Sequence, residues 1–220
     1  SSYSRSDITD PNVFAGSLDA MLQAMTANGA GGVIANLPNV TDIPYFTTVP
    51  HNPVPLDEAT AALLNQSYGA YNAGVAGALN FLVSQLAITQ DEADAEIAKR
   101  TITFSPGNTN AVVLFDEDLT DLTGINPALV SMRQATEEDL MVLTSRTFIG
   151  TLADPNNPTS INGVAVPLAD TWVLTPEEQA SVETALTAYN QTIEALATAY
   201  DLAFVDANSL LNELKTTGFQ

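Results

Sequence analysis

The feature that most constrains the fold is a pair of segments in which an amphipathic helix leads into a short, apolar strand. The first helix is predicted to begin at Pro11 after a capping Asp10 and to end at Gly29, with its strand over 31–37. The second is predicted from the Thr175-Pro176-Glu177-Glu178 motif to about Tyr200, with its strand over 202–206. Strands that are apolar on both faces are typical of parallel sheets, so each segment is interpreted as half of a βαβ crossover.

Between these segments the sequence predicts a long helix and a mixed region. Five prolines within 38–56 predict an irregular connection, because each proline fixes φ and lacks an amide donor. Asp57 caps a long helix that ends near Leu86, and the glycines inside it indicate close packing or a bend. Further on we expect a helix from Thr89 to about Lys99, strands over 101–104 and 111–115 that form a possible hairpin, and a short helix from Thr136.

We therefore expect an α/β fold in three parts. Residues 1–86 supply a helix–strand–helix part of an α/β core, and residues 173–220 supply its final helix and strand. Residues 87–172 form an inserted α+β subdomain or a lid.

Charge and cysteine content exclude several classes of function. The chain has 26 acidic and 6 basic residues, a net charge of −20, which disfavours nucleic acids and anionic membrane surfaces as partners. It has no cysteine, so disulfides and thiolate metal sites are excluded. No apolar run approaches the roughly 20 residues of a membrane-spanning helix. The polar opening, residues 1–6, carries no initiator Met and no signal peptide, and we expect the chain to be an interior part of a larger protein.

Two stretches carry a resemblance to a known family. One is Ala30-Gly31-Gly32-Val33-Ile34-Ala35-Asn36-Leu37-Pro38-Asn39-Val40-Thr41 with Ile43-Pro44-Tyr45-Phe46, and the other runs from Tyr189-Asn190 to Phe204-Val205-Asp206-Ala207-Asn208. They resemble late strands of SGNH (GDSL-type) esterases and lipases, in the large exported or lipoprotein form of Bacteroidetes-type bacteria. The resemblance implies a flavodoxin-like three-layer α/β/α fold, ester hydrolysis by a Ser-His-Asp triad without a cofactor, and a location in the cell envelope or outside the cell.

The blocks that carry catalysis in that family are absent from this sequence. No Gly-Asp-Ser, Gly-Asn-Ser, Gly-x-Asn-Asp or Asp-x-x-His occurs, and Gly16-Ser17-Leu18 lies within a predicted helix. No catalytic residue is therefore assigned, and no metal or cofactor is expected. The missing blocks would lie in N- and C-terminal parts of the same protein, which the resemblance implies as partners alongside a small-molecule or lipid ester.

The candidate substrate-pocket residues follow from the position of the two strands. Ligands in open α/β sheets bind at the carboxyl ends of the strands. The residues at or near those ends are Asn36, Pro38, Asn39, Phe46, Asp206 and Asn208. The alternative is a loop in which the asparagine side chains cap nearby backbone groups.

Two further features allow a functional and a structural reading. His51 is the only histidine, and a proline-flanked loop can deliver it to a site, although a surface or packing role is the simpler interpretation. Asp116, Asp118 and Asp121 have the oxygen-rich spacing of a calcium site, or they form a solvated turn.

Three functions remain open at this stage. The first is part of an exported serine ester hydrolase that is inactive alone. The second is a non-catalytic cell-envelope module that binds a glycan, lipid or protein. The third is calcium-dependent adhesion through Asp116, Asp118 and Asp121.

Overall fold

The computed structural model describes residues 7–217, so the polar opening segment 1–6 lies outside the described residues. The chain divides into two compact units, both of which mix helices with short strands. Of the described residues, Tyr45–Thr175 form the inserted unit, and the split unit combines residues 7–44 with 176–217. The insertion was predicted to begin at residue 87, whereas the inserted unit begins at Tyr45 and includes the long helix.

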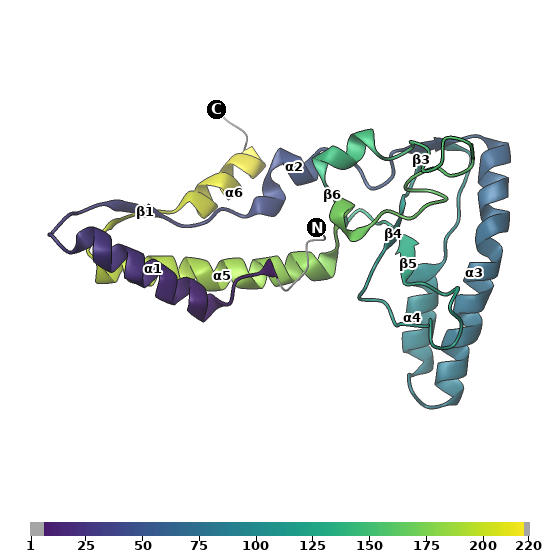
Figure 1. Ribbon diagram of the computed structural model, residues 1–220, viewed down its shortest axis with the longest axis horizontal. Coiled ribbons are helices and arrows are strands. Elements are labelled where there is room, and N and C mark those ends of the chain that lie inside the picture. The colour runs from purple at the N-terminus through teal and green to yellow at the C-terminus, as the bar shows by residue number, and fades with distance from the viewer. Residues whose placement is uncertain (1–6, 218–220) are drawn as a thin grey trace. The chain divides into compact units, whose positions relative to one another are not determined.

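The split unit is built on two helices that lie side by side, α1 (Pro11–Thr26) and α5 (Pro176–Ala199) (Figure 1). The Asp10 carboxylate accepts the amides of Asn12 and Val13, so the predicted cap of α1 is confirmed. The rings of Phe14 and Tyr189 stack with centroids 4.4 Å apart and join the two helices. This helix pair positions the strand that follows each helix.

Those strands, β1 (Val33–Ala35) and β8 (Ala203–Val205), pair in parallel, with Ile34 opposite Phe204. The predicted helix-to-strand order is thus confirmed, but the prediction that the strands are buried is wrong. Val33 is 71% exposed and Val205 is 44% exposed. The reason is that the described residues of the split unit supply a single pair of strands rather than a wide sheet with neighbours on both edges.

Two helical segments complete the split unit. A 3₁₀ turn, η2 (Val40–Asp42), follows β1, and α6 (Ala207–Thr217) follows β8. Helix α6 was not predicted from the sequence. Its start is marked by Asp206, whose carboxylate accepts the amide and hydroxyl of Ser209.

The inserted unit packs a helical hairpin against short antiparallel strands. The hairpin consists of α3 (Glu58–Ser84) and α4 (Gln90–Arg100), which lie side by side (Figure 1). Both caps are as predicted: Asp57 accepts the amide of Thr60, and Thr89 and Glu92 form a capping box. The remaining elements are α2 (Pro44–Thr47), β2 (Val54–Leu56), β3 (Gly107–Asn110), β4 (Val113–Phe115), β5 (Met132–Gln134), β6 (Leu140–Met141), η3 (Leu143–Thr147), η4 (Asp170–Trp172) and β7 (Val173–Leu174).

Strand pairing in this unit differs from the predicted hairpin. Residues 101–104 form no strand, because the side chains of Asn72 and Asn65 bind the backbone of Ile102 and Phe104 instead. The observed pairs are β2 with β3, β4 with β5 and β6 with β7, all antiparallel. The hairpin prediction was therefore wrong.

The predicted helix at Thr136 is also wrong. The segment forms a turn before β6, and Asp139 accepts the Thr136 amide at 2.7 Å. The Asp139 carboxylate also binds Arg133 through both of its oxygens, at 2.6 and 2.7 Å. A tertiary ion pair thus overrides the local helix-start signal.

Two buried arginines fix the core of the inserted unit. Arg100 donates to the Tyr71 hydroxyl, to Glu96 and to the carbonyl of Val130. Arg133, which is 1% exposed, lies between the carboxylates of Asp116 and Asp139. Each guanidinium has several partners, as a buried charge requires.

Candidate functional site

The carboxyl ends of β1 and β8 bring together four of the predicted pocket residues. The Asn36 amide donates to Asp206 at 2.7 Å, and the Asn36 carbonyl oxygen accepts the backbone amide of Asn208 at 2.9 Å. The Asn208 side chain in turn accepts the backbone amide of Asn39 at 3.0 Å. Asn36, Asn39, Asp206 and Asn208 therefore form one hydrogen-bonded cluster, called here the strand-end cluster.

Within the strand-end cluster each side chain also serves nearby structure. The Asn39 oxygen accepts the amide and hydroxyl of Thr41 and caps η2. Its amide donates to Glu183 of α5 at 3.1 Å. Hydrogen bonds from Ser209, and then from Asn36, lower the pKa of Asp206 below its ordinary value, which keeps it ionised. These contacts match the structural alternative, in which the side chains cap backbone groups.

Asn190 belongs to the same region, although no role was predicted for it from the sequence. From α5, its oxygen accepts the Leu37 amide at 2.8 Å and its amide donates to the Leu37 carbonyl at 2.9 Å. Because the Asn190 side chain binds both the amide and the carbonyl of Leu37, it fixes the path of the chain after β1. Its partner lies 153 residues away in sequence, so the only available signal was a polar residue in the middle of α5.

An apolar hollow of about 360 Å³ lies next to the strand-end cluster within the split unit. Pro38, a predicted pocket residue, lines it together with Leu37 and Val40, which also follow β1. Helix α5 supplies the opposite wall, and Asp7 brings a carboxylate. The full lining is Asp7, Ile8, Thr9, Leu37, Pro38, Val40, Val182, Ala185, Leu186 and Tyr189. The hollow suits an apolar group more than a charged one.

The remaining predicted pocket residue, Phe46, belongs to the inserted unit. It lies in α2, where its ring contacts Tyr45 edge to face at 5.1 Å between centroids. His51 is in the same unit and is half-buried. Its carbonyl accepts the Val112 amide, and among the described residues no hydrogen bond joins its ring to an acid or a hydroxyl. A catalytic histidine makes both of these contacts, so the described residues do not place His51 in a triad.

The predicted calcium residues do not converge. Asp116 is fully buried, and its carboxylate contacts Arg133 at 2.5 Å and Lys99 at 3.5 Å. The Asp121 carboxylate accepts the amide and hydroxyl of Thr123 instead. Among residues 7–217 these aspartates form no group close enough to share one ion, so the geometry gives the calcium hypothesis no support.

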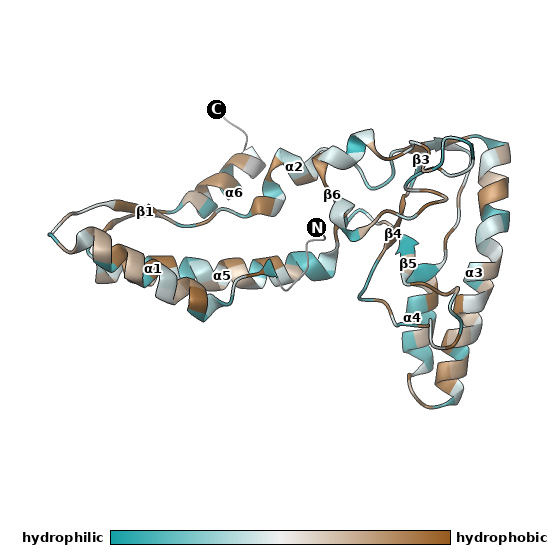
Figure 2. Cartoon of the chain, in the orientation of Figure 1, coloured by the Kyte–Doolittle hydropathy of each residue, from teal (hydrophilic) through white to brown (hydrophobic). Residues whose placement is uncertain are grey.

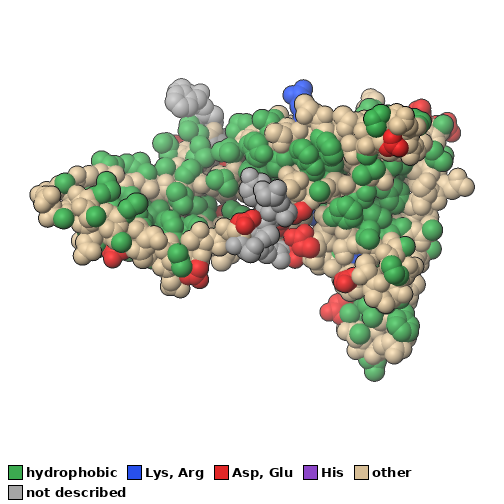
Figure 3. Space-filling model, viewed as in Figure 1, with side chains coloured by type: hydrophobic (Ala, Val, Ile, Leu, Met, Phe, Trp, Pro, Cys, Tyr) green, Lys and Arg blue, Asp and Glu red, His purple; other side chains and the backbone are tan. Residues whose placement is uncertain are grey.

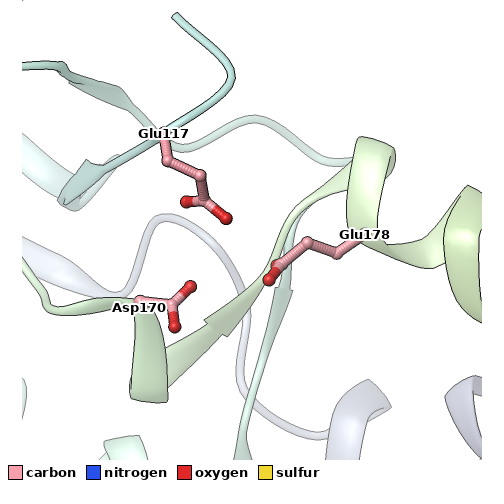
Figure 4. A group of neighbouring side chains, drawn as sticks. All are labelled: Glu117, Asp170 and Glu178. Carbon is pink, nitrogen blue, oxygen red and sulfur yellow. The ribbon is translucent and has the colours of Figure 1, made fainter. Parts of the chain in front are cut away.

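Two other carboxylates of the inserted unit lie closer together than those of the predicted calcium residues. Glu117 follows β4 and Asp170 begins η4, and their carboxylates turn toward each other (Figure 4). Glu178, labelled in the same view, lies in α5 of the split unit. Two carboxylates alone supply too few oxygens for a calcium site, and we assign no metal to them.

The hollows lined by the described residues of the inserted unit include the following two. One, of about 460 Å³, lies between the proline-rich loop and η3, with Pro50, Pro53 and Arg146 in its lining. The other, of about 430 Å³, is mainly apolar and includes Leu63, Tyr68 and Phe115. Neither lining contains a histidine.

Comparison with known proteins adds no assignment. The chain matches no family model, and no curated protein and no solved structure is detectably similar to it. Among residues 7–217, no helix combines the length and the apolar content needed to cross a bilayer.

Proposed function

We propose that this chain is part of an exported SGNH-type serine ester hydrolase with a flavodoxin-like core. The observation that carries the proposal is the parallel β1–β8 pair, in which each strand follows a helix and ends in the strand-end cluster. An apolar hollow lies beside that edge, where open α/β sheets bind their ligands. The substrate class that fits is an ester with an apolar acyl group.

In such a hydrolase a serine oxygen attacks the ester carbonyl while a histidine takes its proton. The alcohol then leaves with that proton, and water cleaves the acyl-enzyme to regenerate the serine and release the acid. The present chain would supply sheet strands, their covering helices and the wall of an acyl pocket. The nucleophile and its base would come from other parts of the same protein, so this chain alone is expected to be inactive.

A non-catalytic cell-envelope module is the second candidate. One observation favours it: the polar side chains of the strand-end cluster already bind one another and the backbone. Groups satisfied in this way stabilise a surface without needing a substrate. A glycan, lipid or protein would then bind on the split unit without being cleaved.

A fluorophosphonate probe separates the two candidates, because it reacts covalently with an activated serine. The 220-residue chain and the longest product of its gene are treated in parallel and measured by intact mass. The hydrolase predicts that only the long product gains the mass of the probe. Labelling of neither product would favour the binding module, and labelling of the short chain would contradict the assignment of the nucleophile to another part.

A further inference from the structure

The outer edge of β1 presents main-chain groups that no strand of the described residues pairs. The Ala203 amide donates to the Gly32 carbonyl at 3.0 Å, and the Asn36 amide donates to the Val205 carbonyl at 3.1 Å. In a parallel pair, alternate residues bond to the partner strand, so Gly32, Ile34 and Asn36 face β8. The amides and carbonyls of Val33 and Ala35 therefore point away from β8.

The two edges of this strand pair are unequal. By the same alternation, Phe204 is the one residue of β8 whose amide and carbonyl both point away from β1. The β1 edge thus offers two complete residues for pairing and the β8 edge offers one. A further strand gains more hydrogen bonds on the β1 edge.

Several apolar side chains of the β1–β8 pair are not covered by other parts of the described structure. Val33, Phe204 and Val205 are 71%, 38% and 44% exposed. Figure 2 shows the apolar character of β1, and Figure 3 shows hydrophobic side chains at the surface over β1 and α6. Parallel strands are normally covered on both faces, and a two-stranded sheet is marginal in water.

The β1 edge also lacks the features that prevent an exposed edge strand from pairing with another strand. Such edges usually carry a charged side chain, a proline or a bulge, and Val33–Ala35 has none of these. Self-pairing through this edge would bring two chains of net charge −20 together, which electrostatic repulsion opposes. The edge therefore fits an uncharged, apolar strand better than a second copy.

We propose that the outer edge of β1 pairs with an apolar β-strand from a part of the same protein outside these 220 residues. The inference rests on the proposed function for the source of that strand, because a hydrolase of this kind needs further segments to supply its triad. It adds the surface on which those segments assemble, with Val33 and Ala35 as the residues that bind the new strand.

Amide hydrogen exchange tests the proposal in the 220-residue chain and in the longest product of its gene. The amides of Val33 and Ala35 should exchange as exposed groups in the short chain. In the long product we expect their exchange to slow by about 100-fold or more, as for amides within a sheet. The Ile34 amide, which already faces β8, serves as the internal control.

Two proline variants sharpen the test. Ala35→Pro removes only an outward amide, so it should leave the thermal midpoint of the short chain nearly unchanged and lower that of the long product. Ile34→Pro removes an amide that faces β8 and should destabilise both. Val33→Lys, which puts a charge on the open strand without a backbone change, should likewise affect only the long product.

The proposal is overturned if Val33 and Ala35 stay unprotected in the long product, or if the gene encodes nothing beyond these residues. Dimerisation of the short chain, seen by sedimentation and abolished by Ala35→Pro, would assign the edge to a second copy instead. Fluorophosphonate labelling judges the function separately. If the long product is labelled but Val33 and Ala35 stay unprotected, the hydrolase is supported and the added strand is rejected. If the long product is not labelled but both amides are protected, the added strand is supported and the hydrolase is rejected.

Discussion

Replacing Arg133 by methionine should destabilise the inserted unit strongly. Its guanidinium donates to Asp116 at 2.5 Å and to both oxygens of Asp139 at 2.6 and 2.7 Å. Both carboxylates are buried, so the variant leaves two charges in the core without their main partner. Removing one member of a buried ion pair costs about 3–5 kcal/mol, a large part of the roughly 5–15 kcal/mol that stabilises a typical domain.

Lys99→Met is the matched control. Its ammonium lies 3.5 Å from the same Asp116 carboxylate, but its side chain is 36% exposed. An ion pair with one solvated member contributes about 1 kcal/mol or less, so this loss should be several-fold smaller. Urea unfolding followed by tryptophan fluorescence measures both variants. The single tryptophan, Trp172, stacks on Phe148 inside the inserted unit and reports on that unit directly.

The dependence on pH gives a second signature. Burial alone would raise the pKa of Asp116, but hydrogen bonding and charge from Arg133, aided by Lys99, lower it below its ordinary value of 3.8. A lowered pKa stabilises the fold above about pH 4, and this contribution is lost as the pH falls through the folded-state value. In Arg133→Met burial dominates, the pKa rises, and protonation relieves the buried charge. The difference in unfolding free energy between the parent chain and the variant should therefore become smaller as the pH is lowered from 7 to 4.

A loss below about 1 kcal/mol for Arg133→Met would refute this reasoning, because it would mean that the two carboxylates reach solvent or new partners without difficulty. A difference in unfolding free energy that stays constant from pH 7 down to pH 4 would refute it as well. Equal losses for Arg133→Met and Lys99→Met would show that burial does not distinguish the two cations.

Three further variants test other contacts. Gly74→Ala should lower the unfolding free energy by about 1–3 kcal/mol, since an added Cβ would lie 2.7 Å from Leu129 Cδ2; the same fluorescence assay measures it. Burial, with a smaller contribution from the neighbouring Tyr71, raises the pKa of Tyr68 to about 12, so its stabilising contribution is present below pH 10 and is lost toward pH 12. Urea midpoints at pH 9 and 11 should therefore differ less in Tyr68→Phe than in the parent. Asn190→Ala should destabilise the split unit by about 1–3 kcal/mol, seen as faster amide exchange in β1, because the Leu37 backbone loses both partners.

Helix boundaries were largely predictable from the sequence because they depend on nearby residues. Asp10, Asp57 and Thr89 each cap the helix that follows them, through hydrogen bonds that span two or three residues. Helix α6 was missed, and the helix expected at Thr136 is a turn, because the ion pair between Asp139 and Arg133 replaces it. A capping pattern fails where a tertiary contact uses the same side chain.

The strands and the site were predictable only in part, because both depend on distant residues. The apolar strand sequences identified β1 and β8, but not their exposure, which depends on the neighbours that flank them. The position of Asn36 and Asp206 at one sheet edge followed from the parallel topology. The bonds of Asn190 to Leu37 did not follow from any local pattern, since they join residues 153 apart.

The insertion of one unit into the other sets an order of events during synthesis. Asn36 and Asp206, which meet at the ends of β1 and β8, are 170 residues apart. At about 5–20 residues per second, the ribosome delivers β8 roughly 10–30 s after β1. The inserted unit is complete before then and has time to fold, which shortens the loop that must close when β1 meets β8. Until that moment Val33, Ile34 and Ala35 lack β8 as a partner, and an apolar strand with an unpaired edge is prone to aggregate.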